Sequence, residues 1–117
     1  MSFVSIDRAS YEVQPGLSIV DRIDWTIGRG EFHCLVGRSG CGKTTLLKLA
    51  AGLLQPTDGA VRIQGSPVRE PSAEVGFVFQ TPTLLEWRTV IDNVLLPVSL
   101  KHRPQPQDRR RAEELLD

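Results

Sequence analysis

The sequence is poor in cysteine and histidine, and this scarcity excludes several kinds of site. Its two cysteines, Cys34 and Cys41, have neither C-x-x-C nor Cys/His metal spacing, and Cys41 lies in a glycine-rich loop whose backbone a disulfide would distort. We therefore expect reduced thiols and a cytoplasmic protein. His33 and His102 stand alone in the sequence, so we expect ordinary surface or strand positions for them rather than metal ligation.

Excess charge and long apolar runs are also missing. The 14 Lys and Arg balance the 14 Asp and Glu, whereas nucleic-acid binding depends on an excess of basic residues facing the phosphates, so no nucleic-acid partner is expected. The apolar runs are far shorter than the roughly 18 residues of a membrane span, and the first residues, MSFVSIDR, do not resemble a signal peptide. The chain is expected neither to cross a membrane nor to be exported.

What the sequence does contain is the pattern of one mixed α/β domain, for which 117 residues with 40% hydrophobic content are sufficient. Alternating or short apolar stretches bounded by turns predict strands. In RIDWTI, Ile23, Trp25 and Ile27 share one face of a half-buried strand, and EFHCLVG is typical of a strand buried in the middle of a sheet. The predicted strands are 3–7, 22–27, 31–37, 60–65 and 74–80.

Helical spacing of apolar residues predicts three helices. The first runs from Lys43 to about Gly52 or Leu54, and the second begins after a capping box of Thr89 and Asp92. After a proline-containing loop, 101–108, a third helix is expected in RRRAEELLD. There the i,i+4 pairs Arg109 with Glu113 and Arg110 with Glu114 indicate a solvated helix face rather than a phosphate-binding patch.

The stretch GRSGCGKTT lies between the predicted strand 31–37 and the first helix. Its pattern, Gly37-x-x-x-x-Gly42-Lys43-Thr44, is that of a phosphate-binding loop, and the strand, loop and helix order is the context that supports it. Glycines let consecutive backbone N–H groups form a concave nest, and the following helix directs its positive end to the same place. A plain glycine turn before a helix is the other interpretation.

The residue types in this loop predict the phosphates of a nucleotide, with Mg²⁺, as ligands. The ammonium of Lys43 suits the β- and γ-phosphates, the hydroxyl of Thr44 suits Mg²⁺, and that of Thr45 suits the α-phosphate. Backbone amides complete the nest. The predicted nucleotide-binding residues of the loop are Gly37, Ser39, Gly40, Cys41, Gly42, Lys43, Thr44 and Thr45.

GRSGCGKTTLLKLAAGLLQPTDG resembles the loop, first helix and following turn of the nucleotide-binding subunits of ABC transporters. The resemblance extends over essentially the whole chain, and LLEWRTVIDNVLLPVSL is similar to the corresponding segment in importers of nitrate, sulfonate, taurine and related small solutes. It implies a P-loop NTPase fold of the ABC type, of which residues 1–80 would hold the strands, the P-loop and the Q-loop. Residues 81–117 would begin the helical subdomain.

The same resemblance implies further site residues. GFVFQ resembles the strand that leads into the family's Q-loop, so Gln80 is the candidate catalytic residue that contacts Mg²⁺ or the attacking water. Tyr11 stands about where the family has an aromatic residue that stacks on adenine, although packing in the core is an equal alternative. Trp87 is either an anchor for the transmembrane partner or a core residue.

A transmembrane permease subunit and a second ATPase subunit are the partners that the resemblance implies, with a location at the inner face of the cell membrane. The family's signature LSGGQ, its apolar strand ending in Asp, the adjacent Glu and a later His are not found in these 117 residues. We therefore expect the sequence to correspond to the amino-terminal half of the domain.

Three interpretations follow from these motifs. The chain is the ATP-binding part of an importer ATPase, or a remnant that binds nucleotide without hydrolysing it, or a GTPase or small-molecule kinase, for which no N-K-x-D motif is present. Without the general base, hydrolysis by these residues alone is expected to be slow or absent. Uncovered strand edges and apolar faces favour association or strand exchange between copies.

Overall fold

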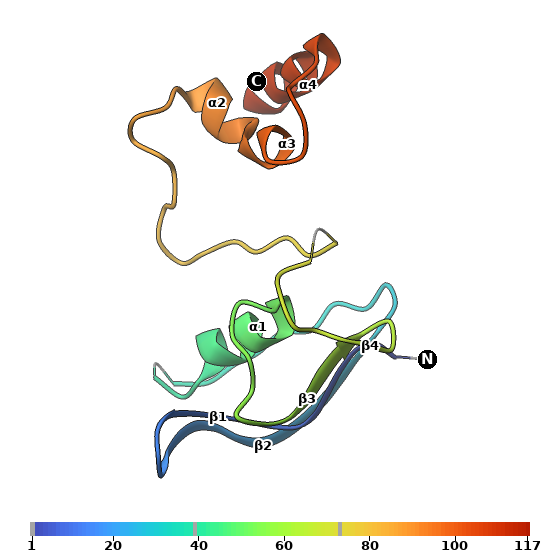
Figure 1. Cartoon of the computed structure of the whole chain (residues 1–117), viewed down its shortest axis with the longest axis vertical. Helices are drawn as coiled ribbons and strands as arrows, with labels where there is room; N and C mark the ends of the chain where they lie inside the picture. The colour runs from blue at the N-terminus through green and yellow to red at the C-terminus, as the bar shows by residue number, and fades with distance from the viewer. Residues whose placement is uncertain (1, 39, 73) are drawn as a thin grey trace. The chain divides into compact units, whose positions relative to one another are not determined.

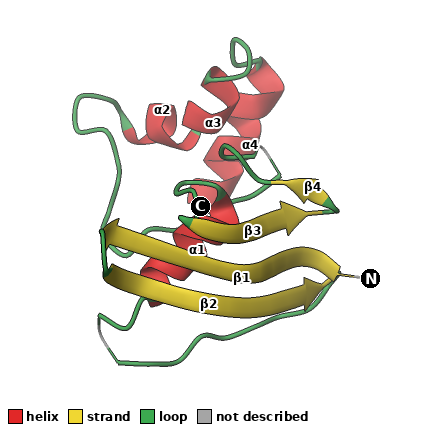
Figure 2. Ribbon diagram, turned by 60° about the horizontal axis from the view of Figure 1, so that its bottom comes forward, coloured by secondary structure: helices red, strands yellow, loops and turns green. Residues whose placement is uncertain are grey.

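The computed structural model describes residues 2–38, 40–72 and 74–117, and it divides the chain into two compact units, Met1–Phe77 and Val78–Asp117. The first unit is built on an antiparallel sheet of four strands in the order β2-β1-β3-β4. A single helix, α1 (Lys43–Ala51), covers one face of this sheet (Figure 2). The strands are β1 (Ser2–Gln14), β2 (Leu17–Gly28), β3 (Asp58–Ile63) and β4 (Ser66–Pro67).

Two bulges shape the long hairpin of β1 and β2. Ile6 and Ala9 are both fully buried although three positions separate them, and the register shifts between them. An extra residue makes this possible, because strict alternation would direct one of the two side chains to the opposite face. Arg8, between them, has φ +46°, and Arg22 on β2 has φ +45° in front of Ile23. The two bulges therefore keep the apolar residues of both strands on the face that α1 covers.

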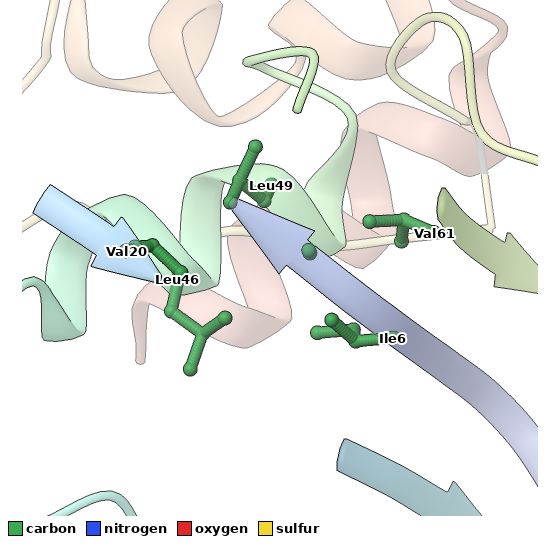
Figure 3. Close-up of a cluster of buried hydrophobic side chains, with 6 residues drawn as sticks. Ile6, Val20, Leu46, Leu49 and Val61 are labelled. Carbon is green, nitrogen blue, oxygen red and sulfur yellow. The ribbon is translucent and has the colours of Figure 1, made fainter. Parts of the chain in front are cut away.

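The core of the first unit forms where α1 meets this face. Leu46 and Leu49, three residues apart on the helix, lie on its buried side, and Leu49 is only 1% exposed. Ile23 and Trp25 pack against the cluster, which confirms their predicted face. The cluster consists of Ile6, Ala9, Val20, Leu46, Leu49 and Val61 (Figure 3).

Residues with positive φ end the helix of the first unit and form its tight β3–β4 turn. Helix α1 ends at Ala51 because Gly52 adopts φ +80°, the left-handed conformation that terminates helices, and the N–H of Leu53 donates to the Lys48 carbonyl at 2.9 Å. Gln64 and Gly65, both with positive φ, join β3 to β4 in a tight hairpin. The predicted bounds of this helix and of strand 60–65 are confirmed to within a few residues. The predicted strands 3–7 and 22–27 cover only part of β1 and β2, because β1 continues to Gln14 and β2 already begins at Leu17.

Two of the predicted strands are wrong. Among the described residues, 31–37 and 74–80 do not form strands (Figure 1). Phe32 is 94% exposed, Val36 92% and Val78 97%. A strand of the buried, parallel kind needs a hydrogen-bonded neighbour and a covered face, and the four-stranded sheet supplies neither to these segments.

The second unit is helical, with α2 (Val90–Val94), α3 (Leu96–Ser99) and α4 (Pro106–Leu116). Helix α2 begins as predicted, since the Thr89 hydroxyl accepts the Asp92 N–H at 3.2 Å. Helix α4 begins three residues earlier than predicted. Gln105 and Asp108 form a capping box around Pro106, the first helical residue, where its fixed φ and missing N–H cost nothing.

The solvated face of α4 is confirmed in part. Arg109 and Glu113 form the predicted i,i+4 ion pair at 3.7 Å, but Glu114 pairs at 3.4 Å with Arg111 rather than with Arg110. All of these side chains are more than half exposed, so the pairs contribute little to stability. Among the described residues, no helix combines the length and the apolarity that crossing a bilayer would require.

Candidate functional site

The glycine loop lies directly before α1, and its backbone is curved by left-handed glycines. Gly40 has φ +83° and Gly42 has φ +99°, and the N–H of Cys41 donates to the Arg38 carbonyl at 3.2 Å. Gly42 is also the cap of α1, whose first intrahelical bond runs from the Leu46 N–H to the Gly42 carbonyl at 2.9 Å. Ser39, a predicted ligand residue, lies outside the described residues.

The amino terminus of α1 presents backbone donors that its own residues do not use. The first N–H groups of a helix have no intrahelical acceptor, and Gly42 has no side chain to cap them. The first turn contains no acidic residue that would neutralise the positive end of the helix dipole. Thr44 is exposed and Thr45 half-buried in this turn. This arrangement favours an anion.

Lys43 extends its side chain back along the loop. Its Nζ donates to the carbonyl of Gly37 and, at 3.1 Å, to that of Arg38. An ammonium has three donors, so one N–H is left for an acceptor outside these two bonds. The charge of Lys43 is thus held at the loop, against the carbonyls of Gly37 and Arg38.

A small cavity of about 180 Å³ adjoins the loop. Cys41, Gly42 and Lys43 form one wall, and Ile19 and Val20 of β2 form another. A Cβ on Gly42 would lie 2.9 Å from the Ile19 carbonyl oxygen, so any other residue at this position would force the loop or β2 to shift. The sequence analysis missed the β2 residues, because nothing in their local pattern distinguishes them from other strand residues.

Tyr11 lies on β1, opposite Val20 in the strand register, and packs half-buried against the core cluster. Its backbone therefore neighbours a strand that lines the cavity, while its contacts are those of a core residue. Gln80 belongs to the second unit and is exposed. The adenine role of Tyr11 and the Mg²⁺ role of Gln80 stay predictions.

A hydrogen-bonded group that the sequence analysis did not foresee connects β2 to the segment before the loop. Trp25 Nε1 donates to His33 Nδ1 at 3.0 Å, and His33 Nε2 lies 3.4 Å from Glu31 Oε1. An indole nitrogen can only donate, so the proton of His33 is on Nε2, which donates to Glu31. Glu31 also accepts the N–H of Gly28 and closes the turn after β2. His33 is thus a structural residue.

These bonds make the charge of Glu31 favourable in the folded chain. The backbone N–H of Gly28, and second the His33 ring, lower the pKa of Glu31 below its ordinary 4.5. A lowered pKa means that this contribution to stability is present above about pH 4.5 and is lost as the pH falls through the folded-state value. Replacing His33 by alanine should raise the pKa of Glu31 only in part, since Gly28 is the larger cause. A carboxyl ¹³C NMR titration of both proteins measures this shift, and an unchanged pKa would contradict the His33 contact.

Comparison with known proteins shows the family to which the chain belongs. A family model described as ABC transporter matches residues 20–117, which include the loop, α1 and the second unit. The chain belongs to the ABC transporter family. The predicted fold class, a partial ABC nucleotide-binding domain of mixed α/β type, is thereby confirmed.

Individual ABC transporter proteins match nearly the whole chain. The taurine import ATP-binding protein TauB of Mesorhizobium japonicum is 39% identical over 99% of this chain and 46% of its own length. The aliphatic sulfonates import ATP-binding protein SsuB of Bacillus subtilis is 40% identical over 97% and 44%. The bicarbonate transport ATP-binding protein CmpD of a Synechocystis strain is 36% identical over 95% and 40%. The chain spans less than half the length of these curated relatives.

A solved ABC transporter structure also matches. The ATP-binding cassette MJ0796, in a dimeric post-hydrolysis state bound to ADP and Pi, superposes with a TM-score of 0.82 at 28% identity, over 95% of this chain and 54% of that one. About half of a cassette is therefore present here.

Proposed function

We propose that this chain is the ATP-binding part of an ABC importer ATPase, and that its glycine loop binds the phosphates of ATP. The observation that carries the proposal is the loop itself: left-handed Gly40 and Gly42, uncapped amides at the start of α1, and the Lys43 ammonium beside them. The membership in the ABC transporter family and the likeness to a cassette that binds ADP support it.

Within this proposal, each loop residue has a chemical task. Lys43 balances charge on the β- and γ-phosphates, Thr44 contributes its hydroxyl to Mg²⁺, and Thr45 contributes a hydrogen bond near the α-phosphate. Bound Mg²⁺ would neutralise charge on the phosphate oxygens that the loop amides also face. Tyr11 would stack on the adenine, and Gln80 would contact Mg²⁺ or the attacking water.

The names of the relatives suggest the solute of the complete transporter. TauB, SsuB and CmpD are named for taurine, aliphatic sulfonates and bicarbonate. All three are small solutes that carry an anionic group. We propose import of such a solute, of the nitrate, sulfonate or taurine type, by the transporter to which this chain belongs.

We further propose a permease subunit and a second ATPase subunit as partners, at the inner face of the cell membrane. The exposed apolar side chains of the second unit support the permease contact: Trp87 is 79% exposed, Leu84 69% and Val90 64%. In the first unit, the exposed Phe32 and Val36 favour association between copies of the chain. The molar mass in solution tests this last point.

Binding without hydrolysis is the proposed behaviour of these 117 residues by themselves. They contain the phosphate-binding loop but neither the LSGGQ signature nor an apolar strand ending in Asp and Glu. Positioning of the attacking water is therefore incomplete, while the phosphate contacts are present.

Two measurements test the proposal. Titration calorimetry with ATP, in Mg²⁺ and in EDTA, measures binding, and a single-turnover assay measures hydrolysis. We expect Mg²⁺-dependent binding of ATP without turnover. A folded sample that binds no ATP would refute the proposal, and turnover would refute its restriction to binding. A preference for GTP over ATP would favour the GTPase interpretation.

A further inference from the structure

Another cavity of the first unit, of about 530 Å³, lies on the face of the sheet that α1 leaves uncovered. Asp7 directly follows the buried Ile6 on β1, so alternation directs its side chain away from the helix. Arg62 of β3 lies on the same side, because it forms an ion pair with Asp7 at 2.8 Å. The charged residues that line this cavity, which we call the sheet cavity, are Arg8, Arg22, Arg62, Asp7, Asp24 and Asp58.

Two of these arginines occupy a backbone conformation that arginine rarely adopts. Arg8 has φ +46° and Arg22 has φ +45°, in the left-handed region that glycine and asparagine take more easily. Each bulge is held by a side chain of the other strand: the Arg8 N–H donates to Asp24 Oδ1 at 2.8 Å, and the Arg22 N–H donates to Ser10 Oγ at 2.9 Å. These bonds use the backbone alone, so neither bulge needs a guanidinium group.

The guanidinium groups of Arg8 and Arg22 are therefore available to a ligand. Among the described residues, that of Arg8 forms no hydrogen bond or ion pair, and that of Arg22 has only an ion pair of 3.7 Å with the adjacent Asp21. Both side chains of this pair are more than 70% exposed, so the pair contributes little. A planar guanidinium donates two parallel N–H groups to a sulfonate or a carboxylate, which makes the two arginines suitable for an acidic group.

Asp24 and Asp58 bring carboxylates to the same cavity. Among the described residues they accept only backbone N–H groups, that of Arg8 for Asp24 and that of Gly59, at 2.9 Å, for Asp58. Gly59 lets β3 approach the bulge of β1 closely, since a Cβ there would overlap the Arg8 carbonyl. Each carboxylate has a second oxygen that can accept from an ammonium group. The charges of the sheet cavity balance, so a ligand with one acidic and one basic group fits it better than a simple anion.

We propose that the sheet cavity binds a small zwitterion, whose acidic group is held by Arg8 and Arg22 and whose ammonium group is held by Asp24 and Asp58. Taurine, an ammonium joined to a sulfonate by two carbons, is such a molecule. The choice of taurine rests on the proposed function, because it belongs to the solute class proposed there. The ATP-binding part would then bind the imported solute at a site separate from the glycine loop.

A titration of the whole chain with taurine, followed by ¹H–¹⁵N NMR at low ionic strength, tests the site. We expect saturable shifts of the backbone amides of Arg8, Arg22, Asp58 and Gly59, with an affinity in the millimolar range because the charged groups are exposed. Ethanesulfonate and ethylamine each carry only one of the two charged groups, and each should bind about tenfold more weakly. The absence of saturable shifts with taurine, or equal binding of ethanesulfonate, would overturn the proposal.

Substitution of the two arginines locates the binding. Arg8→Asn and Arg22→Asn remove the guanidinium and suit a left-handed backbone, so neither should lower the midpoint of urea unfolding. Each should weaken taurine binding about tenfold. Arg69→Asn removes the same charge from the first unit but outside the sheet cavity, and this matched control should leave taurine binding unchanged. Unchanged taurine binding in both cavity variants, or an equal loss in Arg69→Asn, would overturn the site.

ATP affinity, measured on the same samples, separates this inference from the proposed function. The glycine loop precedes α1, which covers the opposite face of the sheet, so all three substitutions should leave ATP affinity at its original level. Taurine binding without any ATP binding would refute the proposed function and still support the sheet cavity. ATP binding without taurine binding would overturn the sheet cavity alone.

Discussion

Replacing Lys43 by alanine is expected to weaken ATP binding by about 100-fold. A hydrogen bond to a charged group contributes about 1.5–3 kcal/mol, and about 1.4 kcal/mol corresponds to a factor of ten in affinity. Lys43 Nζ already lies in the loop, bonded to the carbonyls of Gly37 and Arg38, so its charge is in place before the phosphates arrive. Titration calorimetry with Mg·ATP on both proteins measures the loss.

Lys48→Ala is the matched control for this substitution. Lys48 lies in the last turn of the same helix, so its loss removes an equal charge from the opposite end of α1. It costs a few tenths to about 1 kcal/mol of helix stability, and it leaves the loop intact. Thermal unfolding of both variants separates a change in fold from a change in binding. Equal ATP affinities for the two variants would show that Lys43 does not act on the phosphates.

Sequence alone predicted the parts of the fold that depend on local patterns. Helix α1 has a glycine at each end and leucines at helical spacing, and both signals act within a dozen residues. Alternation predicted strands 3–7 and 22–27, but neither their pairing as the hairpin of β1 and β2 nor its bulges at Arg8 and Arg22. A bulge interrupts the regular strand register and thereby keeps apolar side chains on the buried face. Its position therefore depends on the partner strand and on the helix that covers the sheet, and not on the local sequence alone.

The segments 31–37 and 74–80 illustrate the opposite case. Their composition is that of buried strands, and propensity favours an extended backbone, but pairing depends on neighbours elsewhere in the chain. In the described part of the chain neither segment forms a strand, and Phe32 and Val78 are almost fully exposed. Composition therefore predicted buried strands, whereas Phe32 and Val78 of these segments are exposed in the structure.

In the candidate site, too, the features made by consecutive residues were predicted and those made by distant residues were not. The spacing of Gly37, Gly42 and Lys43 predicted the loop, because the nest and the helix terminus are made by consecutive residues. The β2 wall of the cavity beside the loop and the bond between Trp25 and His33 were missed, because they join residues that are distant in sequence or carry no distinctive motif.

Gly42→Ala is expected to reduce both the stability of the first unit and its affinity for ATP. The new Cβ would lie 2.9 Å from the Ile19 carbonyl oxygen and 3.2 Å from Ile19 Cγ2, and φ is +99° at this position. A left-handed conformation costs alanine about 1–2 kcal/mol, and a steric overlap in a packed region adds about 1–3 kcal/mol. We expect a loss of about 3 kcal/mol in the free energy of unfolding.

Gly40→Ala separates these two contributions. Gly40 has φ +83°, close to that of Gly42, but a Cβ there would meet nothing within 4 Å. Its substitution should therefore cost only the backbone strain, about 1–2 kcal/mol. Because β2 is in the way of the new Cβ of Gly42→Ala, the start of α1 must move away from the strand, and the amides that face the phosphates move with it. Urea unfolding and ATP titration of the two variants measure both effects. Equal losses in the two variants would mean that the contact between the loop and Ile19 does not constrain the site.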